Sequence, residues 1–260
     1  MRRAGAFAAL LTFAAVLALT AAGEPAPAPP APAAENGRLA GLPAELQRVL
    51  TRLEEAGAKV HSLQADVQYE RAIELLDEKQ KASGTLEFLK PNLLHLKLGK
   101  PRDEEVYSDG NRWWIVSHGE RQVEVYKADS SSEGAAEAAF LTLGIGQSVT
   151  RLLDSYDVTL KDGAAGKSPG KDQQAPVRHR LRFVPRPGSA PAHFSAVEAV
   201  VPEDTWLPTD LVLYESDGEI VHHFHLAKVR LNVELKPEQF VCRPPRGYAM
   251  IEPAAGLEPQ

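Results

Sequence analysis

The sequence predicts an α+β fold, in which one large curved antiparallel sheet forms an incomplete β-barrel with an N-terminal helix and a short helical lid. Apolar and polar residues alternate in short runs within 84–126 and within 156–231, which is typical of half-buried strands. Turn residues such as Lys90-Pro91-Asn92 and Asp109-Gly110 separate these runs, so consecutive strands should pair as a meander. Apolar residues at helical spacing occur before the first block of strands and between the two blocks.

The first 38 residues differ in composition from the rest of the chain. Arg2 and Arg3 precede an uncharged run over 4–23 that closes on small residues, so residues 1–22 are predicted to be a cleaved secretory signal peptide. A single membrane anchor is the alternative, because the run is long enough to span a bilayer. No Cys lies near the end of the run, so a lipid-modified N-terminus is not expected. Residues 23–38 are rich in Pro and Ala and should form an extended spacer.

Charge and cysteine content narrow the class of protein. The 260 residues carry a formal charge of −6, and loss of Arg2 and Arg3 would remove two positive charges and leave −8. Nucleic acid and an anionic membrane surface are therefore not expected as main partners. The single Cys242 excludes an internal disulfide framework. Residues 39–252 suffice for one domain with a sizeable core, and 253–260 form a tail.

Two segments carry the helical pattern. The first should be one amphipathic helix with Pro43 near its start, Gly57 at its far end and a stripe of Leu39, Leu42, Leu46, Val49, Leu50 and Leu53. The second is an insert over 133–153, with one short helix carrying Phe140 and Leu143 and another over 147–153. Gly144 and Gly146 lie between these two and should act as a hinge.

The remaining elements are strands and turns. Residues 60–75 should be extended, followed by strands near 84–90, 94–98, 113–116 and 123–126, with a charged link over 99–106. Strand patterns return at 156–160, 179–184, 194–201, 211–214 and 220–231. Asp217-Gly218 predicts a hairpin turn between the last two. The Gly- and Pro-containing stretch 162–176 has nothing to bury and is predicted to be a loop.

The order of these segments resembles the LolA-type family of outer-membrane lipoprotein carriers. The resemblance covers about 39–252 and rests on the sequence of motifs, with the export signal before them: Gly84-Thr85-Leu86 with Lys90-Pro91-Asn92, Ser108-Asp109-Gly110, Gln122-Val123, Trp206-Leu207-Pro208, and the stretches 229–232 and 240–248. It implies an unclosed barrel with a helical lid over an apolar cavity. That cavity would hold the acyl chains of a lipoprotein, or related lipids, and carry them across the periplasm.

The resemblance also implies partners and a latch. An inner-membrane exporter and an outer-membrane acceptor would load and unload the carrier, which we expect to be a monomer without cofactor or catalytic activity. The characterised carriers have an arginine before the Pro-Asn turn that ties the lid to the barrel, and this chain has Lys90 there. Lys90 is either a looser latch to a lid carbonyl or an exposed lysine at a strand end. The ligand-binding residues we expect are Leu86, Phe88, Lys90, Leu94, Leu96, Leu98, Trp113, Ile115, Phe140, Leu143 and Ile145.

Other chemistry is less well supported by the sequence. His223 and His225 share a strand face and could clamp a metal with a third ligand, but polar positions on a solvated face are the commoner case, and we expect no metal site. No Gly-x-Ser-x-Gly or His-Glu-x-x-His motif occurs, so a hydrolase lacks its parts. The alternative function is a non-enzymatic envelope protein that senses lipid or lipoprotein with the same fold.

Overall fold

The computed structural model describes residues 39–127, 140–146, 148–161, 176–188, 193–216 and 218–252. Within these residues, twelve strands form one sheet in the order β12-β6-β5-β4-β3-β2-β1-β11-β10-β9-β8-β7. The strands are β1 (Ser62–Ile73), β2 (Glu78–Leu89), β3 (Leu93–Leu98), β4 (Glu104–Asp109), β5 (Arg112–Ser117), β6 (Gln122–Lys127), β7 (Tyr156–Leu160), β8 (Arg178–Pro185), β9 (Phe194–Pro202), β10 (Asp210–Glu215), β11 (Ile220–Leu231) and β12 (Ala249–Ile251). The helices are α2 (Ala44–Ala58), α4 (Val149–Leu152) and the 3-10 turns η1 (Glu74–Leu76) and η2 (Pro237–Phe240).

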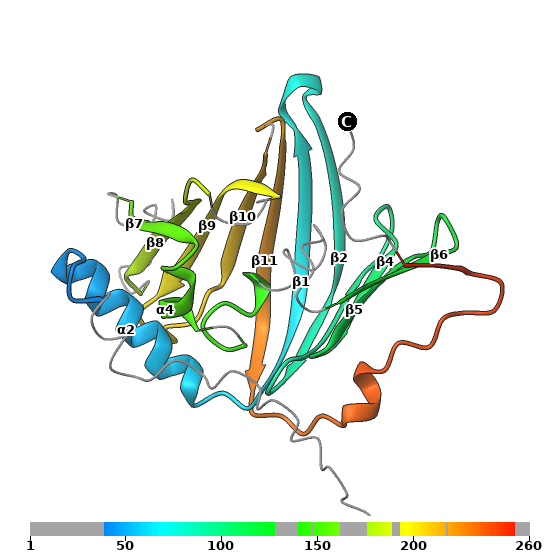
Figure 1. The fold of residues 1–260 in the computed structure, drawn as a ribbon, viewed down its shortest axis with the longest axis horizontal. Helices are drawn as coiled ribbons and strands as arrows, with labels where there is room; N and C mark the ends of the chain where they lie inside the picture. Colours follow the sequence, from blue (N-terminus) through cyan, green and yellow to red (C-terminus); the bar gives the residue numbers. More distant parts are fainter. Residues whose placement is uncertain are drawn as a thin grey trace, which may run out of the picture.

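The sheet is curved and open. Its neighbouring strands are antiparallel except β12, which joins β6 in parallel, and the edge strands β12 and β7 do not pair with each other. Figure 1 shows α2 and α4 beside the β7–β11 half and the C-terminal segment beyond the β4–β6 half. The predicted α+β class with an incomplete barrel is confirmed.

Helix α2 begins later and ends later than the apolar stripe suggested. Pro43 is its N-cap with φ −55° and ψ 139°, an extended conformation, so the helix starts at Ala44 and runs to Ala58. The stripe residues inside it are buried: Leu46, Val49, Leu50 and Leu53. Leu39 and Leu42 precede the helix and are only partly buried against the core. One amphipathic face therefore fixes α2 on the sheet.

The two longest paired strands form a projecting hairpin. β1 and β2 pair from Ser62↔Leu89 to Ile73↔Glu78, so β2 begins before the strand predicted near 84–90. Asp77, in the turn between the two strands, has φ 48°. Residues 78–81 are exposed, and Figure 1 shows the tip of the hairpin extending past its neighbours. The early part of β2 lacks an apolar alternation because this end has little to pack against.

The two faces of the sheet carry separate apolar clusters. The large core cluster combines α2, the insert and the concave face, whereas Val116, Val123 and Val125 form an outer cluster with Tyr107, Trp114, Cys242 and Tyr248. Trp113 packs on the core cluster and Trp114 on the outer one, as expected for neighbours on a strand. The side of each tryptophan is thus fixed.

Two elements differ from the sequence prediction. Residues 104–109 form strand β4 where a charged link was predicted, because Glu105 receives bonds from Lys97 and His95 on β3 that make its burial tolerable. Residues 237–251 contain η2 and β12, which were not predicted because their sequences have no clear apolar period. Residues 1–38, 128–139, 162–175 and 253–260 lie outside the described residues, and so do the expectations that fall on them. In the described part of the chain, no helix has the length and apolarity to cross a membrane.

Candidate functional site

The concave face of the sheet unites the residues expected to bind a ligand. Cross-strand register places Leu86, Leu96, Val106 and Ile115 in one row, from β2 to β5. A second row contains Phe88, Leu94, Ser108 and Trp113. Nine of the expected residues are buried in the core cluster and Trp113 packs on it; the nine are Leu86, Phe88, Leu94, Leu96, Leu98, Ile115, Phe140, Leu143 and Ile145. The sequence analysis missed Val106, because its neighbours Glu104 and Glu105 hid the alternation.

Helix α2 and the described part of the insert cover this face. Leu50 and Leu53 of α2 are fully buried in the same cluster as Leu143 and Val149 of the insert. The Phe140 ring meets Phe183 of β8 edge-on, with ring centroids 6.1 Å apart, and Tyr156 of β7 at 5.7 Å. In this conformation α2 and the insert, rather than water, contact the apolar face.

The cover is held together by polar contacts between α2 and the insert. The Glu54 carboxylate accepts a hydrogen bond from Ser148 Oγ at 2.5 Å and another from the Val149 backbone N–H at 2.9 Å. The second bond satisfies a free N–H at the start of α4. Helix α2 and residues 140–146 and 148–153 therefore form one packed unit, which we call the cover.

Three glycines allow close contact at the cover. A Cβ at Gly57 would lie 1.8 Å from the carbonyl oxygen of Gly144, and one at Gly146 would lie 2.8 Å from the Phe88 ring. Gly144 has φ 80°, a conformation that side chains disfavour. The insert therefore lies directly against the backbone of α2 at Gly144 and against the Phe88 ring at Gly146, and the hinge role of these two glycines stays a prediction.

Lys90 lies at the end of β2 and bonds to the cover. Its ammonium donates to the carbonyl of Gly57 at 2.9 Å and to that of Ala58 at 3.3 Å. These carbonyls lie in the last turn of α2, where a cation also interacts favourably with the helix dipole. The sequence had suggested a carbonyl of the insert as partner; helix α2 is the partner instead, since its C-terminal turn lies between the insert and Lys90.

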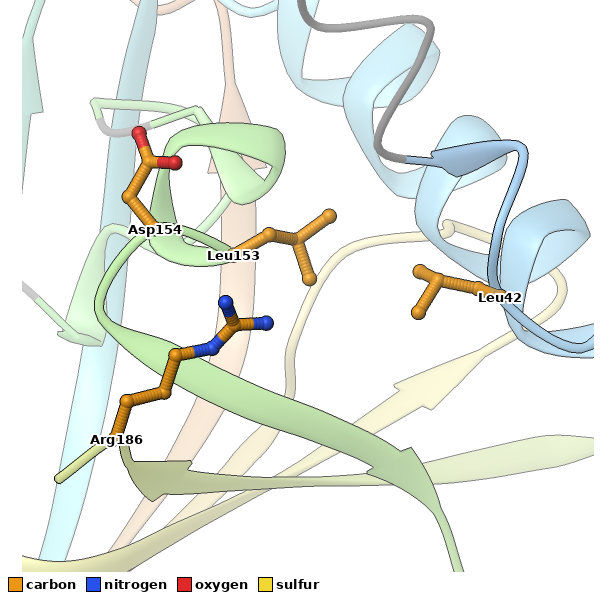
Figure 2. Close-up of a pocket in the computed structure, with 4 residues that line it drawn as sticks. All are labelled: Leu42, Leu153, Asp154 and Arg186. Carbon is orange, nitrogen blue, oxygen red and sulfur yellow. The ribbon is translucent and has the colours of Figure 1, made fainter.

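A hollow opens at the edge of the cover. It measures about 360 Å³ and is lined by Leu42, Leu153, Asp154 and Arg186. Figure 2 shows Leu42, from the turn before α2, across from Leu153, which follows α4, with Arg186 below them after β8. Arg186 Nε lies 2.9 Å from Asp157 Oδ1. The hollow therefore combines two leucines with a charged rim, next to the open β7 edge of the sheet.

The outer face carries Glu105, a carboxylate with a strongly lowered pKa. Burial would raise the pKa of Glu105, but hydrogen bonds from Tyr107, Lys97, His95 and His118 outweigh it and lower that pKa to about 2. His118 Nδ1 lies 2.9 Å from Tyr248 Oη of the C-terminal segment. Burial and then the Glu105 charge raise the pKa of the Cys242 thiol to about 11, so this thiol is a poor nucleophile. Glu105 is thus charged at neutral pH and joins Lys97, His95, Tyr107 and His118 into one polar cluster, which we call the outer hub.

The histidines of β11 occupy both faces. His222 is buried, 2.9 Å from Tyr69 Oη and 2.7 Å from Glu215 Oε1. His225 Nδ1 lies 2.8 Å from Asp210 Oδ1, whereas His223 Nε2 is 3.9 Å from the same oxygen. Among the described residues, no group of three or more His, Cys, Asp or Glu side chains is arranged to hold a metal ion.

An open antiparallel barrel with a covered apolar concave face defines the class of protein, and the comparisons give its family. The chain belongs to the LolA family: the family model described as "Outer membrane lipoprotein carrier protein LolA" matches residues 58–243. A similar protein is an outer-membrane lipoprotein carrier protein from Alkalilimnicola ehrlichii, 24% identical over 178 residues that cover 68% of this chain and 71% of the relative.

Two solved structures are similar at low identity. An uncharacterized conserved protein from Thermus thermophilus has 14% identity and a TM-score of 0.49, covering 80% of this chain and 99% of that one. A LolA superfamily protein from Nitrosomonas europaea has 12% identity and a TM-score of 0.39, covering 75% and 97%. At these TM-scores the two likenesses carry no argument about function.

Proposed function

We propose that this protein is a periplasmic carrier that holds the acyl chains of lipoproteins, or of related lipids, against the concave face of its sheet. The observation that carries the proposal is the cover. Helix α2 and the insert form a unit through Glu54 and the Gly57–Gly144 contact, while Lys90 and an exposed Arg48–Glu203 pair at 3.2 Å are polar ties from it to the sheet. None of the twelve described strands of the sheet belongs to this unit, so it can lift from the face without breaking the pairing between those strands.

The burial of an acyl chain is comparable in free energy to the burial of α2 alone. An acyl chain of about fifteen methylenes gains roughly 12 kcal/mol on burial, at about 0.8 kcal/mol per CH₂. The four buried apolar side chains of α2 gain about 1.5–3 kcal/mol each, or roughly 6–12 kcal/mol together, when they pack on the same face. An acyl chain can therefore replace the contacts of α2 on this face at similar free energy. The buried side chains of the insert, among them Phe140 and Leu143, further stabilise the closed state, so loading needs an input from partner proteins.

The family name supports the remaining parts of the proposal. We propose an inner-membrane exporter and an outer-membrane acceptor as the protein's partners, and the predicted signal peptide over 1–22 would deliver the chain to the periplasm. We propose that the protein acts as a monomer, without cofactor, metal or catalytic step. Lys90 is proposed as the latch on α2, and the hollow at Leu42 and Leu153 as the place where the cover first parts from the sheet edge.

The two adjacent tryptophans provide a test of this site. Trp113 packs on the concave core and Trp114 on the outer cluster, and Trp206 is the third tryptophan of the chain. The Trp114→Phe/Trp206→Phe variant leaves Trp113 as the one indole, and Trp113→Phe/Trp206→Phe leaves Trp114. A spin-labelled fatty acid should quench the fluorescence of the first variant strongly and of the matched second variant weakly. Equal quenching, or quenching of Trp114 alone, would rule out the concave face as the acyl site.

Transfer distinguishes the carrier from a sensor of the same fold. A carrier preloaded with acylated peptide should deliver it to acceptor vesicles, whereas a sensor should bind the peptide and retain it. Retention with normal binding would assign the sensing function instead.

A further inference from the structure

The C-terminal segment crosses the outer side of the sheet and ends on its edge. Phe240 of η2 is buried, and Cys242 and Tyr248 belong to the outer cluster. Tyr248 also bonds His118, and the backbone N–H of Ala249 donates to the Arg121 carbonyl at 2.9 Å where β12 joins β6. Figure 1 shows this segment, in orange and red, running outside the β4–β6 half. Residues 241–252, which we call the strap, are thus fixed at several points but lie at the surface.

The strap gathers positive charge on an acidic protein. Arg243 and Arg246 are exposed, and the side chain of Arg121 reaches the strap, with Nη2 3.5 Å from where a Cβ of Gly247 would lie. Within the described part of the chain, the side chains of these three arginines make no hydrogen bond or ion pair, whereas Arg48, Arg180 and Arg182 each pair with a glutamate. Glu252 is the one carboxylate between 241 and 252, although the whole chain has a charge of −6.

The strap also exposes large apolar side chains. Val241 is 53% exposed, Met250 54% and Ile251 39%, in a segment of only twelve residues. Apolar side chains next to unpaired arginines are the composition that binds the interface of an anionic bilayer, where the apolar groups enter the headgroup boundary and the cations meet lipid phosphates. An exposed apolar pair elsewhere, Leu75 and Leu76, is followed by Asp77 and Glu78. The two lysines beyond it, Lys79 and Lys81, both pair with Glu70.

We propose that the strap, together with Arg121, is a docking surface for anionic phospholipid bilayers. The contact is peripheral: the strap remains paired with β6, and only its exposed side chains meet the lipid. It is separate from the concave face, so it does not depend on the acyl-chain site. Such docking would hold the protein at a membrane surface through a local basic patch, despite the acidic net charge of the chain.

Vesicle sedimentation tests this proposal. Protein lacking residues 1–22 is used, because the two arginines and the apolar run of the predicted signal peptide would bind bilayers themselves. It should sediment with vesicles containing phosphatidylglycerol but not with phosphatidylcholine vesicles, and 1 M salt should release it, since the Debye length falls to about 3 Å. At about 1 kcal/mol per arginine, Arg243→Gln/Arg246→Gln should weaken binding roughly 25-fold. Met250→Ser/Ile251→Ser should also weaken it.

Two matched variants serve as controls. Arg151→Gln/Arg178→Gln removes two other exposed arginines, and Leu75→Ser/Leu76→Ser removes the other exposed apolar pair; neither should change binding. The proposal is overturned if wild type ignores anionic vesicles at low salt, or if the control arginine pair matters as much as the strap pair. Binding to a soluble polyglutamate peptide without binding to vesicles would also overturn it, and would assign the strap to an acidic protein partner.

Discussion

The contact between Gly57 and Gly144 makes the cover sensitive to one methyl group. In Gly57→Ala the new Cβ would lie 1.8 Å from the Gly144 carbonyl oxygen, and ordinary contact begins at 3.4 Å. The insert must therefore move away from α2 by about 1.6 Å. Such overpacking costs about 1–3 kcal/mol, whereas alanine returns up to about 1 kcal/mol of helix propensity to α2. We expect the free energy of unfolding to fall by about 1–2 kcal/mol, because the contact between the insert and α2 is weakened.

The assay measures access to the concave face. Gly57→Ala should take up a fluorescent fatty acid faster than wild type, and the backbone amides of residues 140–146 should exchange hydrogen faster, because the closed cover is selectively weakened. Chemical denaturation gives the accompanying change in the free energy of unfolding.

Two glycine variants control for general destabilisation. In Gly84→Ala the new Cβ would also lie 1.8 Å from a carbonyl oxygen, but that of Lys97 on the next strand. This variant should therefore lower stability without selectively speeding hydrogen exchange in residues 140–146. In Gly119→Ala the new Cβ would meet no atom within 4 Å, so stability and probe uptake should stay close to those of wild type. If Gly57→Ala takes up the probe at the wild-type rate despite its stability loss, or if Gly84→Ala speeds uptake equally, the cover does not gate the face.

Further changes follow from the latch, the outer hub and the leader. Lys90→Ala should speed uptake of a fatty acid about tenfold or more, because loss of a charged hydrogen bond to α2 costs the closed state about 1.5–3 kcal/mol, and Lys90→Arg should slow uptake; unchanged stopped-flow uptake in both would make Lys90 a surface lysine only. The lowered pKa of Glu105, from 4.5 to about 2, stabilises the fold above pH 4.5 by about 3 kcal/mol, and this contribution is lost as the pH falls through 4.5 toward 2. Glu105→Gln should therefore flatten the pH dependence of urea midpoints in that window, and an unaltered slope would mean that the hub is not formed. N-terminal sequencing of periplasmic protein should begin near residue 23; intact protein in the membrane pellet would instead favour an anchor.

Side-chain alternation was sufficient to place most of the sheet. The prediction succeeded for strands with one face in the core and one in solvent. Examples are β3, with Leu94, Leu96 and Leu98, and β11, whose full range was predicted. The pattern failed for β4, where Glu104 and Glu105 interrupt it. The partners that make this strand possible, Lys97 and His95, lie on β3 and are not readable from the local sequence.

The candidate face was predictable, but its contacts were not. Period-2 spacing is enough to assign Leu86, Phe88 and Ile115 to one side, because strand register follows from short turns. The partner of Lys90 depends on where α2 ends in space, which its sequence position does not determine. The strap was missed for a different reason: its three-residue strand has no period, and its position comes from tertiary contacts of Phe240 and Tyr248.

The central claim is that this protein carries acyl chains on its concave face. Its most direct test is organic extraction of protein purified from the periplasm of its host, followed by mass spectrometry, for wild type and for a Leu96→Asp variant with native circular dichroism. Leu96 is buried in the middle of the face, and Val123→Asp in the outer cluster is the matched control for a buried charge. We predict lipoprotein acyl chains, or related lipids, in wild type and Val123→Asp, and their loss in Leu96→Asp. Wild-type protein that carries no acylated molecule, or a folded Leu96→Asp variant that carries as much as wild type, would contradict the account.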